Sequence, residues 1–307
     1  MAVVRIKEKV GSVLEYYHRG VYPANNTGFA NIDEYWKPRL GNTTIVTGYP
    51  SMGKTEFTLQ ILVNCTMLHG WKHALYTPET GTSEEVILEL VHKATGKTAQ
   101  KGYANTISEM ELLNATNYLD QYFYIIEPDE VKGLTVNEWY EDVQYIIKET
   151  KIHTATIDNW NDLTHDLNNY GGKISEYLKH QLPRFNRFCK SEMIHGFILA
   201  HPKSPEKLGG SKLPPAKPND IEGGSLWWAK AQSLITIHRD LENEQDKTTQ
   251  VIVHKAKPKI VGKQGFTSLH YHIADGCYSI DGTRQTQPVS YFKEANNIEI
   301  IKDIIPF

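Results

Sequence analysis

The sequence predicts an α/β fold with a mostly parallel central sheet, helices on both of its faces, and antiparallel strands at its C-terminal end. From residue 43 onward, apolar runs of strand length alternate with stretches of helix length, a pattern typical of parallel βαβ units. A glycine-rich stretch joins the first strand to the first of these helices. The last three apolar runs follow one another without long helices between them, which favours antiparallel pairing.

The expected elements follow the chain in order. Strands are predicted at residues 43–47, 73–79, 122–126, 153–158, 196–200, 233–239, 250–256 and 266–273, with a hairpin connection at 257–265. A helix over about residues 54–69 is ended by Gly70. Three more helices begin at capping boxes, in which a hydroxyl and a glutamate three residues later bind each other's backbone N–H groups. These pairs are Thr82 with Glu85, Ser108 with Glu111, and Thr135 with Glu138.

The composition is that of an ordinary globular chain. Its 307 residues carry a net charge of −3, so any anionic ligand must be bound by a local cluster of positive charge. Three widely spaced cysteines, Cys65, Cys189 and Cys277, indicate a reducing compartment without a disulfide framework. The N-terminus does not resemble a signal peptide, and no apolar run is long enough to cross a membrane.

The first 26 residues are expected to form an N-terminal linker helix and tether, and residues 27–307 a single main domain. Val10, Val13, Leu14 and Tyr17 fall on one face of a predicted helix over about residues 3–18. This apolar face has two candidate partners, its own domain and a neighbouring subunit.

The stretch GYPSMGKT matches the phosphate-binding pattern G-x-x-x-x-G-K-[ST] in full, and it lies between a predicted strand and a predicted helix, as this pattern requires. Its glycines let backbone N–H groups turn toward phosphate oxygens, and the helix N-terminus attracts the anion. In this pattern the lysine reaches the β- and γ-phosphates and the threonine hydroxyl binds Mg²⁺. The predicted site for ATP and Mg²⁺ comprises Gly48, Tyr49, Pro50, Ser51, Met52, Gly53, Lys54 and Thr55.

Hydrolysis at such a site requires an acidic group near the metal and a group that activates water. Asp158 and Glu79 each end a predicted strand, and the ligands of parallel sheets gather at these carboxyl ends. We therefore expect Asp158 to assist Mg²⁺ and Glu79 to act as the general base. Asp162 and Asp166 are alternatives to Asp158 that lie farther along a polar loop. His201 follows another strand at the same edge, where a neutral imidazole can report the γ-phosphate.

These motifs together resemble the RecA-type motor domain of ring-shaped replicative helicases, and most of all the bacteriophage and Twinkle-like branch of the DnaB superfamily. The likeness covers about residues 27–273, with the motifs in the same order. The motifs that carry it are TGFANIDEYW, TGYPSMGKTEF, YTPET, IDNWNDLTH, LAHPKSPEK, DIEGGSLWWAKAQSLITIHR and VHKAKPKIVGKQG. The resemblance implies that Lys54 and Thr55 bind nucleotide and Mg²⁺, Glu79 activates water, Asp158 assists the metal, and His201 senses the γ-phosphate.

Two features depart from the family pattern. The family usually has Lys-x-Arg on its penultimate strand, where the arginine enters the ATP site of the next subunit, but this chain has Lys255 and Lys257 there. Lysine lacks the planar fork of arginine, so Arg239, at the end of strand 233–239, is an alternative cation. Family members also commonly carry an N-terminal primase or helical domain, so this chain is expected to be a single-domain helicase or an excised motor domain.

The family has two loops that face a central channel for DNA, and these correspond to residues 164–177 and to the stretch after His201. Between His201 and Asn219, four lysines oppose Glu206 alone, which gives a local charge of four minus one, or +3. Contacts to phosphates hold a strand without reading its sequence. The expected DNA-binding residues are Lys203, Lys207, Lys212 and Lys217.

The sequence therefore predicts an ATP-dependent DNA helicase that forms a ring, expected to be a hexamer, around single-stranded DNA and moves 5′ to 3′ into a fork. Its expected partners are single-stranded and forked DNA, other copies of the chain, and a separate primase or polymerase, with no membrane. The expected location is the cytoplasm of a bacterium or a phage-infected cell. One alternative is a RecA-like recombinase or recombination mediator that binds single-stranded DNA as a filament. A P-loop regulator without hydrolysis is a third hypothesis, and Glu79 and His201 argue against it.

Overall fold

The computed structural model describes residues 3–19, 23–129, 131–203, 213–243 and 245–282. The strands in this part of the chain are β1 (Thr43–Thr47), β2 (His73–Tyr76), β3 (Phe123–Ile125), β4 (Thr154–Ile157), β5 (His195–Ala200), β6 (Ser233–Arg239), β7 (Thr248–Lys255), β8 (Gly265–His272) and β9 (Cys277–Ser279). They form one sheet in the order β3-β2-β4-β5-β1-β6-β7-β8-β9. The strands from β3 to β6 pair in parallel, and β7, β8 and β9 pair antiparallel. The predicted fold class is confirmed.

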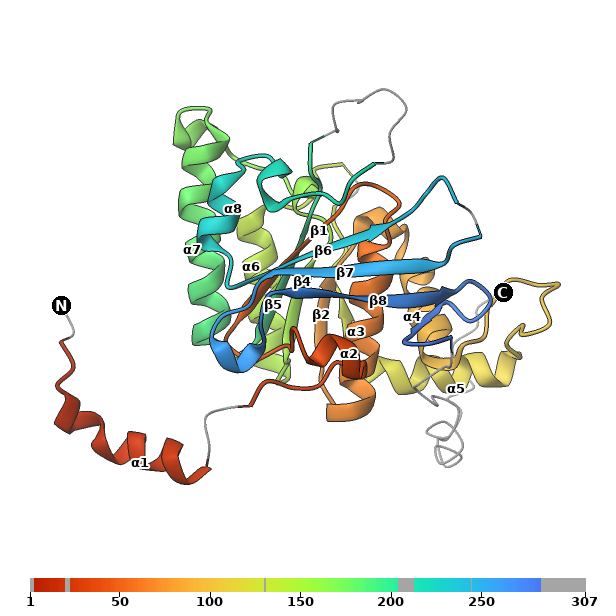
Figure 1. Cartoon of the computed structure of the whole chain (residues 1–307), viewed down its shortest axis with the longest axis horizontal. Helices are drawn as coiled ribbons and strands as arrows, with labels where there is room; N and C mark the ends of the chain where they lie inside the picture. Colours follow the sequence, from red (N-terminus) through yellow and green to blue (C-terminus); the bar gives the residue numbers. More distant parts are fainter. Residues whose placement is uncertain (1–2, 20–22, 130, 204–212, 244, 283–307) are drawn as a thin grey trace.

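Helices cover both faces of this sheet (Figure 1). The helices are α1 (Val10–Arg19), α2 (Ala30–Asp33), α3 (Lys54–His69), α4 (Ser83–Thr95), α5 (Glu109–Asp120), α6 (Val136–Glu149), α7 (Ile174–Ser191) and α8 (Ser225–Lys230). Consecutive strand residues point to opposite faces, so Val46 packs with α3, α4 and α5 whereas Ile45 packs with α6, α7 and α8.

The three predicted capping boxes are present. The side chains of Thr82, Ser108 and Thr135 each accept a hydrogen bond from the backbone N–H three residues later, and the glutamate there bonds back. These caps begin α4, α5 and α6 at the predicted residues. Since each cap involves residues of one turn, local sequence is sufficient to predict it.

Some predicted boundaries were wrong. The strand expected over residues 73–79 ends at Tyr76, and Pro78 begins the 3-10 turn η2 (Pro78–Thr80), which carries Glu79. Proline has no N–H to donate to a strand ladder, so it ends the strand early. The last residues of the predicted channel loop 164–177 form the first turn of α7, which begins at Ile174. Strand β9 has only three residues, too few for the sequence to show a period.

The N-terminal helix stands away from the rest of the molecule (Figure 1). Its apolar side chains are exposed to solvent: Leu14 is 50% exposed and Tyr17 is 79% exposed. Of the two candidate partners, the chain's own domain therefore does not cover this face in the residues that the structure describes.

Candidate nucleotide-binding site

The glycine-rich stretch forms a tight loop between β1 and α3, and two of its glycines are required by geometry. A side chain at Gly48 would come within 2.3 Å of the carbonyl oxygen of Ile237 on β6. Gly53 has a φ of 88° and forms the N-cap of α3, a left-handed conformation that favours glycine. The loop therefore follows the strand edge closely and leaves the N-terminus of α3 facing the anion site.

Three predicted site residues are in contact at this edge. The buried Lys54 ammonium donates to the Tyr49 carbonyl oxygen at 3.3 Å and to His201 Nδ1 at 3.2 Å. With Nδ1 accepting, His201 Nε2–H donates to Glu79 Oε2 at 3.1 Å. Burial lowers the pKa of Lys54, while Glu79 and Asp158 oppose that effect. Lys54, His201 and Glu79 are thus joined by a chain of hydrogen bonds.

Asp158 follows β4 and is buried beside Thr55, whose side chain hydrogen-bonds to it. Burial raises the pKa of Asp158 to about 7, and the charge of Glu79 contributes to the rise. Its Oδ1 atom is buried and has no hydrogen-bond partner among the described residues. A hydroxyl and an unpaired carboxylate oxygen side by side fit Mg²⁺, which prefers oxygen ligands and is held by few carboxylates together with substrate phosphates.

The two alternative acids lie elsewhere. Asp162 is exposed at the end of the 3-10 turn η3 (Trp160–Asp162), and Asp166 accepts hydrogen bonds from Asn168 and Asn169 within its own loop. Within the described part of the chain, neither carboxylate hydrogen-bonds to Thr55. Asp158 is therefore the carboxylate that the fold brings to the P-loop threonine.

Sequence reasoning missed two asparagines that follow Asp158. Asn159 is 2% exposed, and its Nδ2 donates to Glu79 Oε2 at 2.7 Å. The side chain of Asn161 accepts a bond from the backbone N–H of His201 at 3.5 Å. The sequence had no signal for these contacts, because each joins residues that are far apart in the chain.

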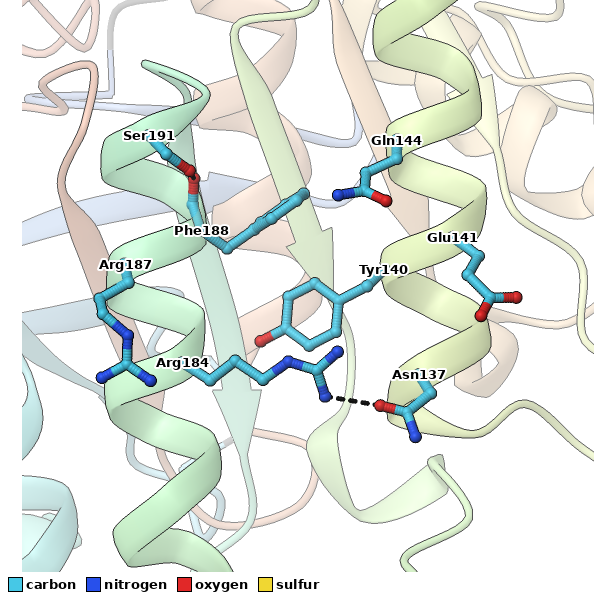
Figure 2. Close-up of a pocket in the computed structure, with 8 residues that line it drawn as sticks. All are labelled: Asn137, Tyr140, Glu141, Gln144, Arg184, Arg187, Phe188 and Ser191. Carbon is cyan, nitrogen blue, oxygen red and sulfur yellow. Dashed lines mark hydrogen bonds between the residues drawn. The ribbon is translucent and has the colours of Figure 1, made fainter.

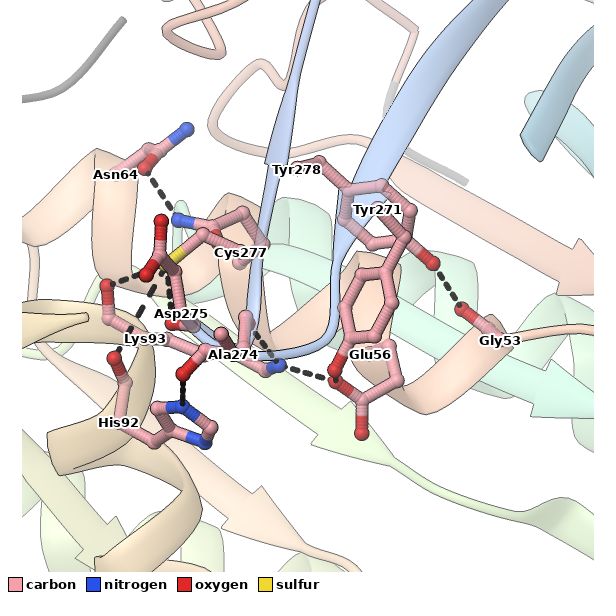
Figure 3. A network of polar contacts seen from close by, with 12 residues as sticks. Gly53, Glu56, Asn64, His92, Lys93, Tyr271, Ala274, Asp275, Cys277 and Tyr278 are labelled. Carbon is pink, nitrogen blue, oxygen red and sulfur yellow. Dashed lines mark hydrogen bonds and ion pairs between the residues drawn. The ribbon is translucent and has the colours of Figure 1, made fainter. Parts of the chain in front are cut away.

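Behind the P-loop, a polar network connects α3 to α4 and to the last strands (Figure 3). Glu56, which received no role from the sequence, forms an ion pair with the fully buried Lys93 of α4 and accepts from the Tyr271 hydroxyl at 2.9 Å. Lys93 also donates to the Gly276 carbonyl oxygen at 3.0 Å, and the Tyr278 hydroxyl donates to the Gly53 carbonyl oxygen at 3.4 Å. Glu56 therefore supports the P-loop from behind and does not face the phosphate site.

The residues that could supply a cation to the ATP site of a neighbouring subunit lie at opposite ends of the strands. Arg239 ends β6 beside the chain's own P-loop, where its backbone N–H contacts Met52 Sδ at 3.3 Å. Because β7 runs antiparallel, Lys255 pairs with Leu234 at the start of β6, far along the strand from that loop. The carbonyl of Lys257 accepts from Asn42, just ahead of β1, so Lys257 also lies at the edge away from the P-loop.

Of the four predicted DNA-binding lysines, two are described. Lys203 and Lys217 are exposed, and the Lys203 backbone N–H donates to the Asp220 carbonyl oxygen at 2.8 Å, which closes the base of the loop. Lys207 and Lys212 lie outside the described residues. The returning segment packs on the P-loop, because Ala216 and Leu213 form an apolar cluster with Tyr49 and Met52.

Two surface cavities differ in their relation to this site. One, of about 380 Å³, is lined by Met52, Leu213 and Arg239 among others, and so adjoins the P-loop. The other, of about 480 Å³, lies between α6 and α7, where the Arg184 guanidinium stacks 4.2 Å from the Tyr140 ring (Figure 2). The second cavity contains none of the predicted site residues, whereas the first is a candidate space for the rest of a nucleotide because it adjoins Met52 of the P-loop.

No protein-family model matches this chain. It is 26% identical over 289 residues to the Twinkle homolog protein, chloroplastic/mitochondrial, of Arabidopsis thaliana. That alignment covers 91% of this chain and 40% of the relative, so the chain spans less than half the length of the curated relative.

Solved structures have the same fold. One of them, an ATPase domain, superposes with a TM-score of 0.71 and 20% identity, over 90% of this chain and 99% of that chain. A DnaB-like replicative helicase, solved for its interactions with primase, gives a TM-score of 0.70 and 21% identity, over 89% of this chain and 68% of that chain. The expected resemblance to DnaB-like and Twinkle ATPase domains is confirmed, and the fold is RecA-like.

Proposed function

We propose that this chain is an ATP-driven motor that encircles single-stranded DNA and unwinds a duplex fork. The observation that carries the proposal is the contact of Lys54, His201 and Glu79 at the end of a P-loop in a RecA-like fold. A general base, a phosphate-binding lysine and a histidine from three separate elements meet where a γ-phosphate would enter. Likeness to a helicase ATPase domain supports ATP hydrolysis as the reaction.

In the proposed reaction, water attacks the γ-phosphorus of ATP while the bond to the β-γ bridging oxygen breaks. Glu79 accepts the proton of the attacking water, and the bond electrons leave with ADP. Lys54 would turn from His201 to the β- and γ-phosphates, where its charge stabilises the oxygens that gain negative charge. His201, released from Lys54, would then report the presence of the γ-phosphate.

Thr55 and Asp158 are the residues that would hold Mg²⁺. A cation held there would supply positive charge that offsets the negative charge developing on the phosphates. Near a cation, a carboxylate remains ionised although burial alone raises its pKa, so Asp158 would bind as the carboxylate.

The loop after His201 is proposed to bind the DNA backbone through Lys203, Lys207, Lys212 and Lys217. His201 and the loop are continuous in sequence, so loss of the γ-phosphate would reposition the lysines together with the histidine. The packing of Ala216 and Leu213 on Tyr49 and Met52 offers a second mechanical link between the P-loop and this loop. Each cycle of ATP hydrolysis would therefore move the DNA phosphates that these lysines bind.

Self-association is proposed because the site lacks a cation from β7 in its own chain. Lys255 and Lys257 lie at the sheet edge away from the P-loop, so any part that they take in hydrolysis would be at the site of another copy. Arg239, beside its own P-loop, is better suited to a role within one subunit. The exposed apolar face of α1 would dock on the adjacent protomer. A hexameric ring and 5′ to 3′ movement complete the proposal.

Other partners follow from relatives. One of the similar structures concerns a helicase that interacts with primase, and we extend to this chain a separate primase or polymerase as partner. Among the described residues, no helix has the length and apolar character to cross a bilayer. A bacterial or phage-infected cytoplasm stays a prediction, since the curated relative is a chloroplast or mitochondrial protein.

The hydrolytic assignment is tested by replacing Glu79 with glutamine, which keeps the shape but cannot accept a proton. ATP turnover stimulated by single-stranded DNA is expected to fall at least about a hundredfold, as general-base removal does, while affinity for an ATP analogue changes little. Asn137→Ser on the exposed surface of α6 is the control and should keep full turnover. Undiminished turnover in Glu79→Gln would remove Glu79 from the mechanism.

A further inference from the structure

The side chain of Asn159 has a fixed orientation. It is the N-cap of η3, and its Oδ1 accepts the backbone N–H of Asn161 at 2.8 Å. A backbone N–H can only donate, so the carboxamide oxygen must face Asn161 and the NH₂ group must face away from it. That NH₂ group donates to Glu79 Oε2 at 2.7 Å.

Glu79 needs such a partner because its own segment holds it weakly. It lies on a turn of three residues, and its side chain is 46% exposed. The recorded hydrogen bonds to its carboxylate in the described residues, from Asn159 and His201, both reach Oε2. Oε1 is therefore the oxygen left to receive a proton from water.

The two donors to Glu79 differ in how they depend on nucleotide. His201 is linked to Lys54, which must turn toward phosphates when ATP binds. The Asn159 side chain is anchored to the backbone N–H of Asn161, and within the described residues it has no hydrogen bond to His201 or Lys54. It can hold Glu79 in both the empty and the occupied site.

We propose that Asn159 is a positioning residue for ATP hydrolysis: its buried carboxamide holds Oε2 of Glu79 so that Oε1 faces the attacking water. This inference rests on the proposed function. A neutral donor suits this task, because a lysine or arginine in its place would pair with the carboxylate and make it a weaker base. Lys54, His201, Asp158 and Asp162 are the other titratable groups around Glu79.

The test must separate two roles of Asn159, which are its hydrogen bond to Glu79 and its cap of η3. Serine is a good N-cap and can still accept the N–H of Asn161, but it has no amide to reach Glu79. Asn159→Ser is therefore expected to keep the thermal midpoint and a KM for ATP within about twofold of wild type, while kcat falls about tenfold or more, as expected for a misplaced catalytic group. Asn159→Asp is the second variant: it keeps the cap and the shape, removes the donor and sets a second carboxylate against Glu79 Oε2, so it should lose at least as much kcat.

A double-mutant cycle shows whether Asn159 acts through Glu79. Glu79→Asp shortens the carboxylate by one methylene and takes it out of reach of Asn159. In that background Asn159→Ser should cost less than about twofold in kcat, because coupled residues are not additive. Asn137→Ser is the matched control for the substitution and should leave kcat unchanged.

Each outcome decides the matter. Wild-type kcat in both Asn159→Ser and Asn159→Asp, or an equal loss with and without Glu79→Asp, overturns the positioning role. If Asn159→Ser fails to fold, Asn159→Asp and its cycle with Glu79→Asp carry the decision. If both variants lose the thermal midpoint in step with kcat, Asn159 acts by stabilising the fold and the positioning role is overturned. Full ATP turnover in Glu79→Gln would instead overturn the proposed function, so the two failures are distinguishable.

Discussion

Two kinds of histidine occupy the central sheet. His201 lies at a strand end, partly exposed, where it contacts the groups of the nucleotide site. His195 begins β5 at the other edge, where its ring lies between the Thr44 hydroxyl and the Arg39 carbonyl. Burial lowers the pKa of His195 to about 4. Position along one strand therefore separates a candidate functional histidine from a structural one.

Burial of His195 leads to a prediction of how the stability of the fold depends on pH. Its pKa is lowered in the folded state, so the unfolded chain takes up a proton first as pH falls below about 6.5. Stability is lost progressively from there down to about pH 4. At pH 5 the loss from His195 is about 2 kcal/mol relative to pH 7.

Denaturant unfolding at pH 7 and pH 5 measures this difference. His195→Gln, which does not titrate, should show a smaller drop in the free energy of unfolding than wild type by about that amount. His18→Gln, on the exposed face of α1, should behave like wild type. An unchanged drop in His195→Gln would mean that this ring is protonated in the folded protein.

At the scale of elements, the P-loop is fixed from several sides. Tyr278 of β9 bonds to Gly53, and Glu56 joins α3 to Lys93 of α4. The sequence predicted the P-loop and the helix caps, since those depend on short fixed spacings. It did not predict the Glu56 network, because that contact depends on how distant elements pack. The strand end at Tyr76 was missed although Pro78 is a local signal for it.

The antiparallel direction of β7 gives a prediction about Lys257, which follows the end of that strand. Lys257 lies at the edge away from its own P-loop, so it should act on the site of another copy. Lys257→Ala is expected to lower DNA-stimulated ATP turnover about tenfold or more, less than the loss of an arginine finger. Lys259→Ala, exposed nearby, should have little effect.

Mixing variants shows whether the lysine acts between subunits. In mixed assemblies, a Lys257→Ala subunit supplies Glu79 and a Glu79→Gln subunit supplies Lys257, so interfaces with both residues should recover turnover. Recovery should increase as the two variants approach equal amounts. Absence of any recovery would show that Lys257 does not act on the neighbouring site. If mixtures of Arg239→Ala with Glu79→Gln recover turnover instead, Arg239 is the residue that acts on the neighbouring site.

At the scale of the whole molecule, the chain is built in a way that suits assembly. Its apolar N-terminal face is uncovered, and its candidate trans lysines lie at the edge away from its own nucleotide site. The sequence predicted the amphipathic helix but left its partner open. The fold narrows that choice, because α1 stands apart from the domain that follows it (Figure 1). How the copies are arranged depends on contacts between chains, which local patterns do not encode.

The N-terminal helix is expected to hold the assembly together. Leu14→Asp with Tyr17→Asp places charge on its apolar face, where burial of a charge is costly. Sedimentation in the presence of an ATP analogue should then change from a large assembly toward the 35.0 kDa monomer. Glu15→Gln, on the same helix, should leave the assembly intact. An assembly unaffected by the two aspartates would show that α1 does not mediate it.

Unwinding of a forked DNA duplex tests whether ATP hydrolysis by this chain drives strand separation. Wild type should release the displaced strand in the presence of ATP and Mg²⁺, and Glu79→Gln should bind the fork without releasing it. A RecA-like recombinase would instead pair homologous strands. Pairing of homologous strands without fork unwinding by the wild-type chain would contradict the account.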